Sequence, residues 1–250
     1  MKGKTTNKSG DLDYMKISKN VLGALVALSF AGVTLTACDN EVKGPKAEVS
    51  EPEKVEEKAE APKTEEAEKP AAAAEEKAAA KELAINKEAS KIEFTGAKIT
   101  GKHDGGFKDF DGKIMVGEDG KVQGVNFTVN TKSVFTDQEK LTGHLQSADF
   151  FDVEKFPEAK FESTSVKEGS DAKTEDGKAY SHTVEGNMTL HGITKKLAFP
   201  AHIDASGDKV VASTDFVIDR STFDIVYKGK PDDLIKQEVQ LRVNFEAPKQ

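Results

Sequence analysis

Apolar and polar positions alternate with a period of two over most of the chain from Ala89 onward. The clearest run is EVQLRVNFEA at 238–247, in which every second residue is apolar. Such alternation is typical of strands with one buried face, because successive side chains of a strand point to opposite sides. The same pattern recurs at 91–96, 121–130, 183–192, 196–204 and 213–219.

Turn-forming residues separate these runs at short intervals, for example at 118–120, 191–192 and 206–208. Many half-buried strands joined by short turns favour an antiparallel sheet that closes into a barrel or folds as a sandwich. The stretch between Asp137 and Phe151 differs, because its leucines have helical spacing. The pattern therefore predicts an all-β domain over 85–250 with one short helical segment.

The chain before this domain begins with a segment typical of a signal peptide. Residues 21–37 are uncharged and mostly apolar, and two lysines, Lys16 and Lys19, precede them. The apolar run is too short for a comfortable membrane span of roughly 20 residues. We therefore assign residues 1–37 to a signal peptide, with translation starting at Met1 or at Met15.

The next segment has the composition of a disordered spacer. Residues 41–84 contain no aromatic side chain and are dominated by Glu, Lys, Ala and Pro. Such a segment buries too little apolar surface to offset the entropy lost on ordering. We expect 38–84 to be a disordered tether, long enough to hold the domain clear of a membrane surface.

The junction between these two segments carries the only cysteine of the chain. The run Leu35-Thr36-Ala37-Cys38 resembles the lipobox of bacterial lipoproteins. This resemblance implies cleavage before Cys38, acylation of its thiol, and a cell-envelope protein that is anchored to a membrane and faces the periplasm. The resemblance leaves the inner and outer membranes as alternatives. The competing interpretations are a secreted protein with an incidental Cys38 and a retained transmembrane anchor.

Four motifs of the folded domain resemble the YceI-like family in order and spacing. They are KDFDGKI at 108–114, HLQSADFFDVEKFPEAKFESTSV at 144–166, GNMTLHGITKK at 186–196 and IDRSTF at 218–223. The resemblance implies a lipocalin-like antiparallel barrel of about eight strands around one elongated apolar ligand, such as a polyisoprenoid or another fatty-chain lipid. The chain departs from the family at Asp224, where the family often has Gly.

The amino-acid composition argues against several other classes of function and site. A single Cys excludes a disulfide within the chain and a zinc site of several thiolates. The net charge of -8 without a basic stripe argues against nucleic acid as a partner. The five histidines lack metal-ligand spacing, and no nucleophile motif is present, so we predict no metal, no cofactor and no catalytic residue.

Phe dominates the aromatic residues, with Phe 14, Tyr 3 and Trp 0. Within the barrel that the family resemblance implies, we expect an apolar lining of Phe94, Phe107, Phe127, Phe161, Met188 and Phe216. His103, His144 and Arg220 are the candidates for contacts to a polar headgroup. The hypothesis is a membrane-anchored lipid carrier; the alternatives are an enzyme acting on such a lipid and a ligand-free structural module with a solid core. A homodimer is one open alternative for the oligomeric state.

Overall fold

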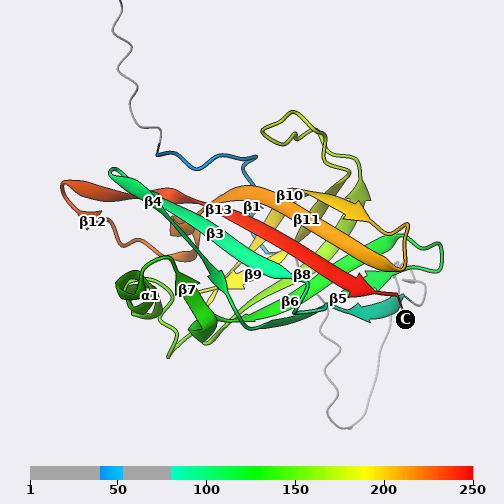
Figure 1. Cartoon of the computed structure of the whole chain (residues 1–250), viewed down its shortest axis with the longest axis horizontal. Coiled ribbons are helices and arrows are strands. Elements are labelled where there is room, and N and C mark those ends of the chain that lie inside the picture. The colour runs from blue at the N-terminus through cyan, green and yellow to red at the C-terminus, as the bar shows by residue number, and fades with distance from the viewer. Residues whose placement is uncertain (1–39, 53–79, 250) are drawn as a thin grey trace, which may run out of the picture. The chain divides into compact units, whose positions relative to one another are not determined.

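The computed structural model describes residues 40–52 and 80–249 and confirms an antiparallel β architecture with one α-helix in that part of the chain (Figure 1). Its longer strands are β3 (Lys91–Lys98), β4 (Gly101–Phe107), β5 (Phe110–Val116), β6 (Val122–Asn130), β8 (Glu158–Glu168), β9 (His182–Leu190), β10 (Ile193–Asp204), β11 (Lys209–Asp219) and β13 (Asp233–Pro248). The shorter ones are β1 (Glu48–Ser50), β2 (Lys81–Ala84), β7 (Val134–Thr136) and β12 (Gly229–Lys230). The helix is α1 (Glu139–Gln146), and the 3-10 turns are η1 (Thr131–Ser133) and η2 (Arg220–Phe223).

The sheet curls into a barrel because two strands bend and take part in both of its halves. Only Lys108 and Asp109 separate β4 from β5, and only η1 separates β6 from β7. β4 pairs with β3 and β7, whereas β5 pairs with β6. With each bent pair counted as one strand, the antiparallel path β4/β5, β6/β7, β8, β9, β10, β11, β13, β3 has the eight members expected of a lipocalin-like barrel.

The core follows from the alternating pattern. Leu197, Phe199 and Ala201 of β10 are all buried, and so are Phe245 and Ala247 of β13. These positions are two residues apart, so they share the inner face of the barrel. Burial of each large apolar side chain stabilises the fold by about 1.5–3 kcal/mol. Because a shift by one residue would expose all of these side chains, this energy determines which face of each strand points inward.

The turn between β9 and β10 has the conformation that its sequence predicts. Leu190 pairs with Ile193, so His191 and Gly192 form a two-residue turn. Their φ angles are 51° and 75°, the left-handed values that two-residue hairpins require. The His191 ring packs against Phe156, with 4.7 Å between ring centroids. The interpretation of His191 as a turn residue is confirmed.

Residues 40–51, which we call the N-terminal arm, lie along the barrel wall. β10 and β11 pair only over residues 202–204 of β10, and the two strands separate over the rest of their length. The arm occupies this gap: β1 pairs with 196–198 of β10. On the other side, the Val217 amide donates to the Pro45 carbonyl and the Ala47 amide donates to the Val217 carbonyl, both at 2.9 Å. The arm therefore joins β10 to β11.

The expectation of a disordered tether over 38–84 does not hold for two short stretches, β1 and β2. β2 pairs with β5 and buries Leu83, so the barrel sheet begins before residue 85. Strand pairing along an existing edge needs few apolar side chains, because backbone hydrogen bonds supply the contact, and composition therefore misses it. The signal peptide, Cys38 and residues 53–79 lie outside the described residues, and their assignments stay predictions. No helix within the described ranges is long and apolar enough to cross a membrane.

Candidate functional site

The barrel encloses a cavity of about 480 Å³, lined by residues from all nine of the longer strands. This volume is in the range of small-molecule sites, which are mostly apolar with a few polar groups that orient the ligand. A protein interior is normally packed as densely as an organic crystal, so space of this size inside a barrel is a specific feature. The barrel is hollow, which contradicts the alternative of a solid core.

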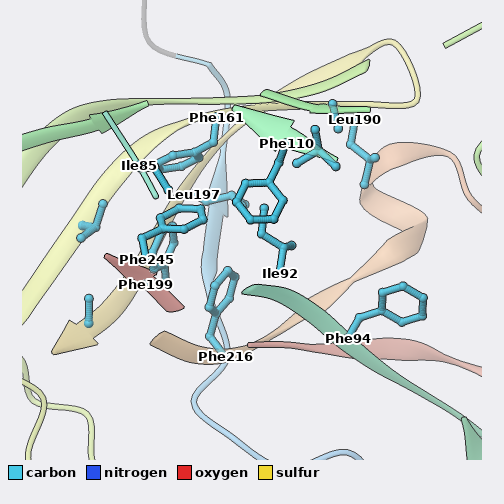
Figure 2. Close-up of a cluster of buried hydrophobic side chains, with 14 of the residues drawn as sticks. Ile85, Ile92, Phe94, Phe110, Phe161, Leu190, Leu197, Phe199, Phe216 and Phe245 are labelled. Carbon is cyan, nitrogen blue, oxygen red and sulfur yellow. The ribbon is translucent and has the colours of Figure 1, made fainter. Parts of the chain in front are cut away.

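All six apolar side chains expected to face a ligand line this cavity; they are Phe94, Phe107, Phe127, Phe161, Met188 and Phe216. The deeper rings form a continuous aromatic wall. The ring centroid of Phe161 lies 5.4 Å from those of both Phe127 and Phe199, and the Phe199 ring stacks on Phe216 with 4.4 Å between centroids. Figure 2 shows Phe161, Phe199, Phe216 and Phe245 converging on one interior, with Phe94 set apart from them. The wall offers dispersion contacts to a hydrocarbon chain along its length.

Two glycines leave space for the Phe161 and Phe94 rings. A Cβ on Gly186 would lie 2.6 Å from the Phe161 ring, and a Cβ on Gly105 would lie 2.5 Å from the Phe94 ring. Both distances are below van der Waals contact, so any larger residue would displace the ring. Because each ring covers a glycine of the wall, it occupies less of the barrel interior.

Most of the polar lining residues gather where β3 meets β4 and where β13 begins, an end that we call the mouth; Ser213 and Thr214 of β11 line the cavity away from it. The polar residues at the mouth are Lys98, His103, Gln138, His144, Arg220, Lys230, Asp233 and Lys236. Asp233 accepts a hydrogen bond from Lys98 at 2.7 Å, and this bond, with those from Thr100, holds the pKa of the Asp233 carboxyl below its usual value. An apolar interior with a polar end matches the two parts of an amphiphile.

Arg220 lines the mouth, but its guanidinium is held by the protein itself. The Nε atom donates to the Lys236 carbonyl at 3.1 Å, and the two terminal nitrogens donate to the carbonyls of Ile225 and Tyr227 at 2.5 Å and 2.6 Å. The side chain is buried, and burial lowers the pKa of the guanidinium. Arg220 therefore fixes the 225–227 segment against β13, a structural role that the sequence did not reveal.

Asp224 ends η2 with φ 58° and ψ 22°, in the left-handed region that favours glycine. This geometry gives a physical reason why the family often has Gly there. Asp tolerates this conformation better than most residues. The departure from the family pattern therefore changes backbone strain at this turn and leaves the turn itself intact.

The two histidine candidates both line the mouth, and each has a carboxylate partner. His103 Nδ1 lies 3.1 Å from Asp137 Oδ1, and His144 Nε2 lies 2.8 Å from Asp149 Oδ2. The His144 ring also stands edge-on to Tyr227, 4.8 Å away. These contacts orient both imidazoles, and whether either one touches a ligand stays a prediction.

Sequence reasoning missed several lining residues. Phe199 and Leu241 lie in alternating runs on the same faces as the named residues, so the same period could have found them. Tyr227, Lys230 and Lys236 have no local signal, because contacts between distant residues bring them to the mouth: Arg220 holds the Tyr227 carbonyl, and β12 pairs with β13. Among the described residues, no cluster of three or more His, Cys, Asp or Glu side chains is arranged to hold a metal ion.

Comparison with known proteins agrees with this geometry. A family model described as the YceI-like domain matches residues 83–247. Among curated proteins, Protein YceI of Salmonella arizonae and of Salmonella newport are each 41% identical over 105 residues, covering 42% of this chain and 50% of the relative. The chain thus spans about half the length of the curated relatives it matches.

Solved structures share the fold at low sequence identity. BcnA of Burkholderia cenocepacia is 20% identical, with a TM-score of 0.55 over 65% of this chain and 99% of that chain. A polyisoprenoid binding domain from Saccharophagus degradans is 13% identical, with a TM-score of 0.51 over 66% of this chain and 97% of that chain. At these identities the likeness is one of fold.

Proposed function

The chain belongs to the YceI-like family, and on this premise we propose that it is a lipid-anchored lipoprotein whose barrel binds one elongated amphiphilic lipid, a polyisoprenoid. It resides in the cell envelope, faces the periplasm and is held by acylated Cys38. Its role is binding or carrying the lipid, without catalysis. The observation that carries the proposal is the apolar cavity of about 480 Å³ with a polar mouth.

The physical basis is the match between the cavity and a long hydrocarbon. The aromatic wall from Phe127 through Phe161 and Phe199 to Phe216 removes a chain from water along its length, which favours binding by about 25 cal/mol for each Å² of apolar surface buried. Polar atoms are few along this wall, so a polar ligand would lose its hydrogen bonds to water without replacement. The structural neighbour described as polyisoprenoid binding supports the choice of an isoprenoid over other chains.

Native mass spectrometry of the full-length protein, purified from membranes in mild detergent, tests the ligand. We expect one bound lipid for each barrel, whose fragments show an isoprenoid repeat. A straight acyl chain in its place would refute the isoprenoid assignment, and protein that takes up no lipid even after incubation with polyprenyl lipids would refute lipid binding.

Membrane fractionation tests the anchor separately. In a chain whose residues 1–37 are replaced by a signal peptide that is cleaved without Cys38, we expect Cys38→Ser to move most of the protein into the soluble fraction after a salt wash, because several acyl chains on one residue anchor firmly. A variant that stays with salt-washed membranes as the unmodified sequence does would contradict the role of Cys38.

A further inference from the structure

The rim of the mouth carries an unusual concentration of exposed apolar side chains. Among the described residues the large exposed apolar side chains are Val49, Ile99, Val226 and Leu234, and the last three belong to segments that border the mouth. Ile99 and Leu234 are direct neighbours, because the Ile99 amide donates to the Leu234 carbonyl at 3.1 Å. Their exposed fractions are 53% and 45%. Single exposed apolar residues are common, but a group around the opening of an apolar cavity marks an interaction surface.

Lysines stand among the cavity-lining residues of the mouth, although the whole chain is acidic. Lys+Arg 36 against Asp+Glu 44 gives the chain a net charge of -8. The cavity-lining residues at the mouth include Lys98, which pairs with Asp233, and the exposed Lys230 and Lys236, whereas Arg220 is buried. Lysines flanking exposed apolar side chains are typical of surfaces that rest in the interface of an anionic membrane.

The N-terminal arm starts at this same rim. Asn40 Nδ2 donates to the Ile99 carbonyl at 2.8 Å, and Lys102 hydrogen-bonds the Glu41 carbonyl. Further along, the arm is fixed between β10 and β11 by β1 and by ion pairs that include Lys195 with Glu51 at 2.7 Å. The arm is thus held against the barrel from Asn40 to Glu51, beginning beside Ile99.

We propose that the mouth is a membrane-docking face: Ile99, Val226 and Leu234 enter the interface of an anionic bilayer, and the flanking lysines contact lipid headgroups. The cavity then opens toward the bilayer, so a lipid exchanges between bilayer and barrel without crossing water. The role of the anchor in this inference rests on the proposed function, because Cys38 precedes Asn40 by two residues and two residues of chain span at most about 7 Å.

The test uses the mature chain, from residue 38 onward, carrying Cys38→Ser, so that docking is measured without the acyl anchor and without the apolar segment 21–37. The probes are vesicles of phosphatidylglycerol and phosphatidylcholine and vesicles of phosphatidylcholine alone. The rim variant combines Ile99→Asp with Leu234→Asp, and the matched control is Val49→Asp, an exposed apolar residue of the arm that lies outside the mouth segments. Co-sedimentation gives the bound fraction, and transfer of a pyrene-labelled polyprenyl lipid between vesicles gives the exchange rate.

We expect the Cys38→Ser chain to bind the anionic vesicles in a salt-sensitive way. The rim variant should bind them roughly tenfold or more weakly, since two carboxylates are repelled by the anionic surface and two apolar side chains are lost, and its exchange rate should fall in step. The Val49→Asp control should match the parent. Thermal melts of both variants check folding, and the comparison of anionic with neutral vesicles gives a readout in the parent that needs no substitution.

Equal vesicle binding by the rim variant and the control overturns the docking face, and so does binding that ignores lipid charge. Rim-dependent vesicle binding by a barrel that takes up no polyprenyl lipid supports the docking face and refutes the proposed lipid carrier. The two proposals therefore fail in different measurements.

Discussion

Replacement of Phe161 by Ala distinguishes a ring that faces a cavity from a ring that fills a core. Phe161 is 1% exposed, and its ring contacts Phe127 and Phe199 on the wall while the same side chain lines the cavity. Phe223 is the matched control: it is 0% exposed and does not line the cavity. Both changes delete the same atoms from buried positions.

The expected magnitudes differ because the two rings have different surroundings. Phe→Ala in a packed core costs about 3–5 kcal/mol, and we expect that range for Phe223→Ala. Phe161 also borders the cavity, where some partner atoms are absent, so we expect about 3 kcal/mol, the low end of that range, in the lipid-free protein. The Phe161 ring is 1% exposed and so presents only a small part of its surface to a ligand. A fully buried Phe contributes about 1.5–3 kcal/mol, so we expect about 0.5 kcal/mol from that part, a roughly twofold loss of lipid affinity.

Denaturant unfolding of the lipid-free proteins, together with lipid titration, measures both quantities. The expected result is a smaller loss of stability in Phe161→Ala than in Phe223→Ala, combined with weaker lipid binding in Phe161→Ala alone. Equal destabilisation by the two variants, with unchanged lipid affinity in Phe161→Ala, would refute the reasoning that Phe161 faces a ligand cavity.

Three further outcomes follow from the structure. Mild proteolysis should cut within 53–79 and leave 40–52 bound to the core by strand pairing, which gel filtration of the cut protein in native buffer checks; release of 40–52 would contradict the pairing. Asp224→Gly should stabilise the fold by about 0.5–1 kcal/mol in denaturant melts, because φ is 58° there, and a loss of stability would refute the strain. Burial raises the pKa of Asp215, which accepts hydrogen bonds from Gln240 at 2.7 Å and 3.0 Å, so its contribution to stability is present at low pH and is lost as pH rises through the folded-state pKa. At pH 7 the Asp215→Asn variant should therefore be more stable than the unmodified protein, and this difference should disappear below about pH 4. Thermal melts at a series of pH values measure the difference. A variant that is more stable only at acid pH would refute the raised pKa of Asp215.

The sequence by itself determined the class of fold and part of the apolar lining. The period-two pattern places Phe199 and Phe245 on inner faces whatever the order of the strands, since alternation is a local property of extended backbone. Motifs such as 144–166 indicated the family, and the family implied a ligand cavity. Phe94, Phe161 and Met188 could therefore be named before any pairing was known.

The tertiary structure alone decided what depends on contacts between distant segments. Whether the barrel is hollow depends on how inward side chains meet, as where the Phe161 ring lies over Gly186. The role of Arg220 depends on carbonyls that the fold brings beside it. The N-terminal arm is ordered by the gap between β10 and β11, and a composition rich in Glu, Lys and Ala carries no signal for a gap formed by strands about 150 residues away. Local pattern fixes which side of a strand is buried, and only the folded chain fixes which segment lies across from it.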